Sequence, residues 1–237
     1  MIPFDDDHRH FKGDQMKVFL TGASGVIGTV IRSQLPQYNF LPFDFPNHDA
    51  RNYNDVLTAI AGCDAAIHLA WDTTIENWKT GNISPDNGLM TFNVYTAALA
   101  SGLRRLIMAS SVHAHDYAYW KGPDLIDPYA LPTPDSPYGA SKVFMEALGR
   151  YFSKEGLEVI CIRFMGLNAD NRPSSDDPEG QKKWFSHRDC GELIKAILEA
   201  RSVPNNFVIV HGVSNNTGRM HDISNPFGWM PKDGLQS

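Results

Sequence analysis

The sequence predicts an α/β fold, a doubly wound parallel sheet that is followed by a small C-terminal subdomain. Three features of the chain lead to this prediction. Short apolar runs alternate with segments of helical periodicity, and the runs are apolar throughout, as in strands buried on both faces. A glycine-rich turn follows the first run. Long polar loops follow two later runs, where an open α/β sheet would bind a ligand.

The apolar runs predict strands at residues 16–20, 39–43, 65–70, 106–110, 159–164 and 207–211. Segments with apolar residues every three or four positions predict helices at 26–35, 53–61, 89–100, 141–155 and 190–201. Strands that alternate with helices are typical of a parallel sheet. The long loops are residues 116–137 and 168–181.

Composition and charge exclude several classes of function. The formal net charge of −6 gives no basic surface for nucleic acid. No apolar run is long enough to span a membrane, and residues 1–15 lack the apolar core of a signal peptide. Cys63, Cys161 and Cys190 are far apart in the sequence and favour a reducing compartment. We therefore expect a cytoplasmic protein without nucleic acid or membrane partners.

The first predicted strand runs into a glycine-rich turn that opens a helix, Gly22-Ala23-Ser24-Gly25-Val26-Ile27-Gly28. Gly22 permits the tight turn, Gly25 lets the backbone approach a pyrophosphate, and Gly28 allows close packing of helix on strand. The free N–H groups of the helix N-terminus would face the anion. Asp44, at the end of the second strand, can accept hydrogen bonds from ribose hydroxyls and repels a 2′-phosphate. The pattern predicts a Rossmann-type site for NAD rather than NADP.

Tyr138 and Lys142 are spaced four residues apart, so their side chains share one face of a helix that begins near Tyr138. A tyrosine titrates at about 10, and acting as a base at neutral pH requires its pKa to fall by roughly three units. The Lys142 ammonium and the positive nicotinamide would supply that shift. Ser111 follows the strand 106–110 and can bind a substrate oxygen as its charge develops. The three residues predict a dehydrogenase centre.

Together these motifs resemble the extended short-chain dehydrogenase/reductases, the NAD-dependent epimerase/dehydratase family. The resemblance is carried by TGASGVIG at 21–28, HLA at 68–70, Ser110–Ser111 and YGASK at 138–142, and it covers roughly residues 16–234. The resemblance implies further cofactor contacts at Asp49, Ala50, Leu69, Ala70 and Asn87. It implies structural roles at a strand start, in packing and in an ion pair for Asp64, Asn93 and Arg163, respectively.

The C-terminal third narrows the resemblance. The segments WFSHRD at 184–189, HGVSN at 211–215 and FGWMPKD at 227–233 are similar to the uronate dehydrogenase branch, whose members oxidise the C1 hydroxyl of a hexuronic acid with NAD. This similarity implies substrate contacts at Thr73, Ser111, His113 and Arg172, the last facing a carboxylate. The chain departs from that branch at Trp71, which replaces a small residue beside the cofactor, and at Val112.

For the domains we expect a tail at 1–15, an NAD-binding domain with the catalytic residues at 16–165, and a small substrate-binding portion at 166–237 interleaved with the last strand and helix. The leading interpretation is an NAD-dependent oxidoreductase acting on a sugar or sugar-acid hydroxyl. A sugar 4-epimerase or dehydratase with tightly held NAD and a non-catalytic NAD-binding protein remain alternatives. No metal is expected, because His113 and His115 have no evident third ligand. A homo-oligomer agrees with the resemblance, since the helix bearing Tyr138 packs against a partner in many members.

Overall fold

The computed structural model describes residues 15–72, 81–117, 120, 124–173 and 176–235. Within these residues one parallel sheet has the strand order β2-β1-β3-β4-β5-β6. Its strands are β1 (Lys17–Thr21), β2 (Asn39–Phe43), β3 (Ala65–His68), β4 (Arg105–Ser111), β5 (Glu158–Phe164) and β6 (Phe207–Gly212). The strand order reverses between β1 and β3, and such a switch point opens a crevice at the carboxyl edge. The predicted fold class is confirmed.

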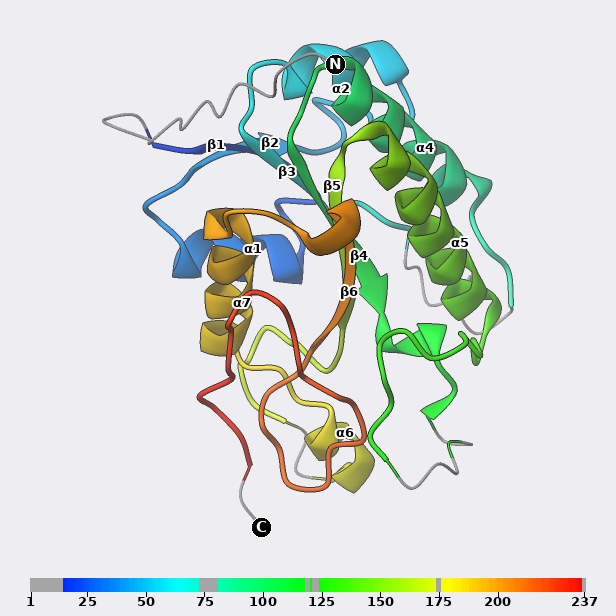
Figure 1. The fold of residues 1–237 in the computed structure, drawn as a ribbon, viewed down its shortest axis with the longest axis vertical. Coiled ribbons are helices and arrows are strands. Elements are labelled where there is room, and N and C mark those ends of the chain that lie inside the picture. The colour runs from blue at the N-terminus through cyan, green and yellow to red at the C-terminus, as the bar shows by residue number, and fades with distance from the viewer. Residues whose placement is uncertain (1–14, 73–80, 118–119, 121–123, 174–175, 236–237) are drawn as a thin grey trace.

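Helices cover both faces of the sheet (Figure 1). The helices are α1 (Val26–Gln34) and α7 (His187–Glu199) on one face, and α2 (Tyr53–Ile60), α4 (Pro85–Ala100) and α5 (Pro137–Phe152) on the other. Short turns of helix occupy the connections at η1 (Val112–Ala114), η3 (Ser153–Glu155), α6 (Pro178–Lys182) and η4 (Pro204–Asn206). Successive residues of a strand enter opposite cores: Leu20 packs in the cluster with α1 and α7, and Phe19 in the cluster with α2 and α4.

The two longest helices begin at prolines, earlier than the apolar periodicity indicates. α4 starts at Pro85 and α5 at Pro137, rather than at residues 89 and 141. A proline is favoured at the first helical position because its missing N–H has no partner there in any case. Ser136 caps α5 by accepting a hydrogen bond from the Gly139 N–H at 3.0 Å. Tyr138 therefore lies in the first turn of α5.

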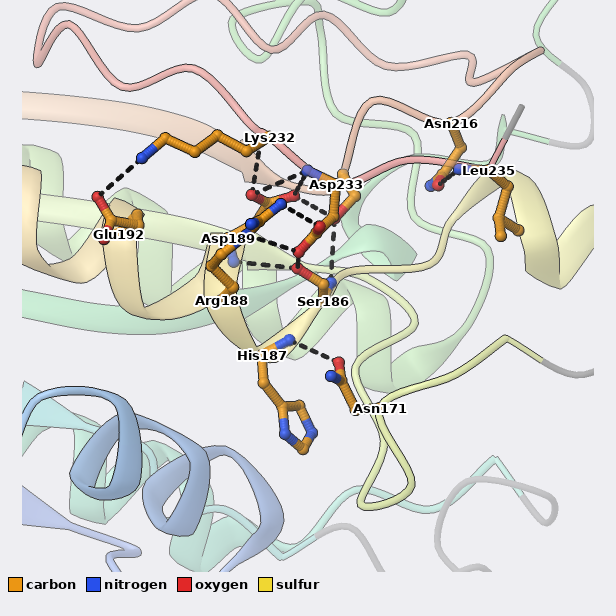
Figure 2. Close-up of polar contacts among 11 residues, drawn as sticks. Asn171, Ser186, His187, Arg188, Asp189, Glu192, Asn216, Lys232, Asp233 and Leu235 are labelled. Atoms are coloured by element: carbon orange, nitrogen blue, oxygen red, sulfur yellow. Dashed lines mark hydrogen bonds and ion pairs between the residues drawn. The ribbon is translucent and has the colours of Figure 1, made fainter.

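The last described residues fold back over the start of α7, as Figure 2 shows. Buried Asp189 accepts hydrogen bonds from the backbone N–H groups of Lys232 at 2.7 Å and Asp233 at 3.1 Å, and from Ser214 Oγ at 2.6 Å. Ser186 Oγ donates to the Asp233 carboxylate at 2.6 Å. The C-terminal sequence motifs that support the resemblance are thus joined to one another in space.

Some sequence expectations concern residues or features outside the sheet. Residues 1–14 of the expected tail, and Thr73, lie outside the described residues. Cys63, Cys161 and Cys190 are free thiols. None of the described helices combines the length and the apolar character needed to cross a bilayer.

Buried histidines make the fold sensitive to acid. His211 and His221 are almost fully buried, with ring centroids 4.9 Å apart. Burial lowers the pKa of His211 to about 3 and that of His221 to about 2. Burial also lowers the pKa of His68 to about 3, and the charge of Lys142 lowers it further. These imidazoles stay neutral in the folded chain at pH values where an unfolded histidine is charged.

We expect the free energy of unfolding to fall steeply as the pH drops below about 6.5. The unfolded histidines bind protons with a pKa of about 6.5, so between that value and the folded pKa the unfolded state holds more protons. Each such imidazole removes about 1.4 kcal/mol of stability per pH unit of acidification. Urea denaturation between neutral and mildly acidic pH measures the slope. His221→Phe should flatten it, and an unchanged slope in that variant would contradict the assignment.

Candidate active site

A cavity of about 570 Å³ opens at the carboxyl edge of the sheet, beyond β4 and β5. The predicted residues Ser111, His113, Tyr138 and Lys142 all line it. Its other lining residues are Ile27, Leu69, Trp71, Ala109, Ser110, Val112, Phe164, Met165, Gly166, Asp177, Gly180 and Lys183. The structure thus gathers the predicted catalytic set on one cavity.

Tyr138 and Lys142 face the same side of α5, with Lys142 Nζ 5.6 Å from the centroid of the Tyr138 ring. Ser111, the last residue of β4, lines the same cavity, and its hydroxyl lowers the pKa of the Tyr138 phenol. The close approach of α5 to η1 sets this arrangement, because a Cβ at Gly139 would collide with the carbonyl oxygen of His113. The predicted spacing along the helix therefore brings the phenol and the amine together.

Lys142 is buried between a carbonyl group and an aromatic ring. Its Nζ donates to Ala109 O at 2.8 Å and lies 3.4 Å from the centroid of the Trp71 ring. Burial lowers the pKa of Lys142 well below its usual value, and the charge of Glu146 opposes that shift. The carbonyl oxygen and the ring face both stabilise the ammonium form. Trp71, at which the sequence analysis expects a departure from the uronate dehydrogenase branch, thus contacts the Lys142 amine directly.

The expected lowering of the Tyr138 pKa by Lys142 is wrong for these surroundings. The pKa of Tyr138 is raised, mainly by burial; the hydrogen bond with Ser111 lowers it and the charge of Asp135 raises it. Lys142 does not counteract the burial, because its ammonium is directed to the carbonyl of Ala109 and the ring of Trp71. The side chains around Tyr138 therefore favour the protonated phenol.

The glycine turn forms a cradle that larger residues would fill. Gly22 has a φ of +68°, and a Cβ there would lie 2.8 Å from Ala70 N. A Cβ at Gly28 would lie 2.7 Å from Ala23 Cα. Gly25 precedes α1 without a side-chain cap, so the N–H groups of the first turn remain open to an anion. This backbone surface fits the pyrophosphate of a dinucleotide.

A second cavity, of about 360 Å³, lies beside the ends of β2 and β3. Four predicted cofactor residues line it, Asp44, Asp49, Ala50 and Ala70. The remaining lining residues are Phe43, Phe45, His48, Arg51, Asp72, Ser84, Asp86 and Met90. Since Ala70 lines this cavity and its neighbour Leu69 lines the first, the two cavities fit the adenosine and nicotinamide ends of NAD.

The remaining predicted cofactor residues lie in different surroundings. Ile27 lines the first cavity, whereas Ser24 and Val26 belong to the exposed turn and the start of α1. Asn87 is buried and, in the described residues, lines neither cavity. Its side chain instead accepts a hydrogen bond from Asp72 N at 2.7 Å and donates to Asp72 O at 3.1 Å, which holds the loop after β3.

Two residues of the cofactor region escaped the sequence analysis. Thr21 Oγ1 accepts hydrogen bonds from Leu69 N and Ala70 N, each at 3.1 Å, and so fixes the backbone between the two cavities. The signal that could have identified Thr21 is its place as a polar residue at the end of an apolar strand. Arg51 lines the second cavity and pairs with Asp49 at 2.7 Å, which lowers the pKa of that carboxyl group. Arg51 thus places a guanidinium group close to the expected position of the ribose.

Asp44→Ala is expected to raise the ratio of NADP to NAD use, in kcat/KM, by about tenfold. The Asp44 carboxylate accepts hydrogen bonds from Ala23 N at 2.8 Å and Ser24 N at 2.9 Å, which places its charge against the turn that would hold the phosphates. Its loss removes repulsion of a 2′-phosphate, and Arg51 on the same cavity can then bind that phosphate. The double variant Asp44→Ala/Arg51→Ala should lose the gain. An unchanged ratio in the single variant would contradict the role of Asp44.

The predicted substrate residues fall into different surroundings. His113 lines the first cavity, with Nδ1 2.7 Å from the Asp135 carboxylate and its ring edge-on to that of Tyr138. Arg172 is exposed, its backbone pairs with Asn168, and it is absent from the described lining of the cavity. The contact of Arg172 with a carboxylate therefore stays a prediction.

Three further expectations concern structural residues. Lys17 N donates to Asp64 at 2.7 Å, Asn93 Nδ2 donates to Ala50 O at 3.1 Å, and Arg163 pairs with Glu146 at 2.8 Å. Each contact matches the predicted role. His113 and His115 are held separately by Asp135 and Thr133. Among the residues that the structure describes, no group of three or more metal-ligating side chains is close enough to hold a metal ion.

Comparison with known proteins agrees with this site. The profile of the NAD dependent epimerase/dehydratase family matches residues 18–186. The chain belongs to this family. A uronate dehydrogenase from Agrobacterium fabrum is 32% identical over 241 residues, covering 93% of this chain and 86% of the relative. An L-arabinose 1-dehydrogenase (NAD(P)(+)) from Haloferax volcanii is 30% identical over 257 residues, covering 92% of this chain and 96% of the relative.

Solved structures agree as well. A mutant uronate dehydrogenase from Agrobacterium tumefaciens complexed with NAD has a TM-score of 0.76 at 29% identity, covering 93% of this chain and 86% of that one. The predicted resemblance to the extended short-chain dehydrogenase/reductases is confirmed, and NAD is the cofactor of this family.

Proposed function

We propose that this protein is an NAD-dependent dehydrogenase that removes a hydride from a hydroxyl-bearing carbon of a sugar or sugar acid. One observation carries the proposal: Ser111, Tyr138 and Lys142, from β4 and α5, meet on a cavity beside a turn that fits a dinucleotide. The relatives named as uronate dehydrogenase and L-arabinose 1-dehydrogenase support a sugar as the substrate.

The hydroxyl pair in the cavity provides the acid–base chemistry. Tyr138 and Ser111 line the same cavity, and the Ser111 hydroxyl acts on the pKa of the phenol, so a substrate oxygen between them can reach both hydroxyls. NAD, when bound, supplies the hydride acceptor and a positive charge on its nicotinamide. Tyr138 takes the proton of the substrate hydroxyl, since a positive charge nearby favours the phenolate. Ser111 donates a hydrogen bond to the substrate oxygen as negative charge develops on it.

Lys142 has a positioning task beside the phenol. Its ammonium carries three N–H bonds, of which Ala109 O takes one. Because Lys142 lines the first cavity together with Tyr138, a remaining N–H can hold a ribose hydroxyl of the cofactor. Burial of the amine makes such partners valuable, because an unpaired buried cation is costly.

A panel of uronates, aldoses and simple alcohols, scored by accumulation of NADH, tests the proposal. A dehydrogenase forms NADH as substrate is consumed, and we expect this with galacturonate or glucuronate. A 4-epimerase or dehydratase returns the hydride and converts its sugar without net NADH. A non-catalytic NAD-binding protein binds NAD and does neither. Failure to form NADH with every compound of the panel would overturn the proposal.

A further inference from the structure

The first cavity contains a second lysine that the sequence did not single out. Lys183 lines the wall formed after β5, next to Gly166, and Asp177 lies on the same wall. Its backbone is fixed there, because Gly166 N donates to Lys183 O at 2.9 Å and Gly166 forms a β-bridge with Trp184. Lys183 therefore contributes a lysine side chain to the wall of the cavity that holds Tyr138, from a segment remote from α5.

The side chain of Lys183 is oriented by one aromatic residue. Lys183 Nζ donates to the Tyr117 hydroxyl at 2.6 Å and lies 4.3 Å from the centroid of its ring. The Tyr117 ring packs against Val112 and Met165, which themselves line the cavity. The long lysine side chain is thus held in one direction before any substrate binds, which reduces the entropy lost on binding.

The hydrogen-bonding capacity of this pair is suited to an anion. An ammonium has three N–H donors and no acceptor, and Tyr117 takes one of those donors. Because Tyr117 accepts from Lys183, its own phenolic proton is free to be donated. Together the two groups present several donors and one positive charge, the complement of a carboxylate.

The charge of the cavity wall favours a single negative charge. Asp177 caps α6 by accepting a hydrogen bond from Gly180 N at 2.9 Å, and its carboxylate remains on the same wall as Lys183. A phosphate dianion would be repelled by the Asp177 carboxylate, and Lys183 alone would have to compensate its two negative charges. A carboxylate monoanion is neutralised by Lys183, and Asp177 can accept hydrogen bonds from the hydroxyls of a sugar.

We propose that Lys183, oriented by Tyr117, is the specificity-determining residue that binds the carboxylate of a sugar-acid substrate. This inference rests on the proposed dehydrogenase function, and it places on Lys183 the carboxylate contact that the resemblance implies for Arg172. Arg172 is exposed and absent from the described lining of the cavity, whereas Lys183 lies on it.

The test compares glucuronate with glucose, which differ in the carboxylate, and uses Lys183→Met. We expect the KM for glucuronate to rise about 10- to 100-fold, the usual worth of a charged hydrogen bond, with kcat nearly unchanged. The kinetic constants for glucose should change by less than about threefold, because glucose has no carboxylate to pair with Lys183. Lys183→Arg should recover most of the affinity for glucuronate, and Tyr117→Phe should raise its KM by a smaller factor.

Lys182→Met is the matched control. Lys182 is the neighbouring residue, its Nζ pairs with Glu179 at 2.6 Å, and it is absent from the described lining of the cavity. We expect no change with either sugar. Equal losses on glucose and glucuronate in Lys183→Met would overturn the inference, as would a wild-type enzyme that oxidises glucose or glucose 6-phosphate but not glucuronate.

Binding measurements separate this inference from the proposed function. If wild type oxidises no compound of the panel, the dehydrogenase proposal fails, and calorimetric titration of glucuronate into the NADH-loaded protein then tests the carboxylate site. Binding that weakens in Lys183→Met but not in Lys182→Met would support the site. No binding to wild type, or equal binding to both variants, would overturn it.

Discussion

The Tyr138→Phe variant is expected to lose at least about 100-fold in kcat while its affinity for NAD stays close to that of wild type. The substitution removes one oxygen atom, the phenolic oxygen that shares the cavity with Ser111 and is proposed to take the substrate proton. Cofactor contacts at the glycine turn and in the second cavity are untouched, because they come from other elements. The loss should therefore appear in the chemical step and not in cofactor binding.

Steady-state rates with the best substrate of the panel give kcat, and fluorescence titration with NAD gives the affinity. Tyr151→Phe is the control, because Tyr151 lies on the same helix but is 59% exposed and is absent from the described lining of the cavity. It should behave as wild type. A decrease of less than about threefold in Tyr138→Phe would remove this phenol from the mechanism.

The fold was predictable because its signals are local. Each strand is a short run of apolar residues, and each of the main helices has its own periodicity. One boundary was wrong because a distant residue decides it. β3 ends at His68 rather than at Ala70, because the N–H groups of Leu69 and Ala70 bond to Thr21 Oγ1. No pattern within residues 65–70 reports a partner nearly fifty residues away.

For the site, too, local contacts were predictable from the sequence and long-range contacts were not. The pairing of Tyr138 with Lys142 was predictable, because four residues of helix bring two side chains together whatever the rest of the fold does. The contact of Lys183 with Tyr117 joins residues 66 positions apart, and only the folded chain brings them together. The raised pKa of Tyr138 escaped prediction for a related reason, because burial is a property of the packed chain.

The second large effect is expected beneath the catalytic residues, in Arg163→Met. Arg163 and Glu146 are 1% and 4% exposed and form two hydrogen bonds of 2.8 Å, while Ser110 Oγ donates to the same carboxylate at 2.6 Å. Removing the guanidinium leaves a buried carboxylate with one hydroxyl as its partner. We expect the free energy of unfolding to fall by about 3–5 kcal/mol, measured by urea denaturation.

The double variant Glu146→Leu/Arg163→Met distinguishes the cost of an unpaired charge from the value of the pair. With both charges gone, most of the lost stability should return, since apolar side chains of similar volume can replace a buried ion pair. Equal destabilisation in the single and double variants would show that packing, and not the unpaired charge, accounts for the lost stability.

Glu146 also raises the pKa of Lys142, one turn away on α5. A folded double variant should therefore have a Lys142 with a lower pKa. As the pH is raised, its rate should begin to decline at a lower pH than that of wild type.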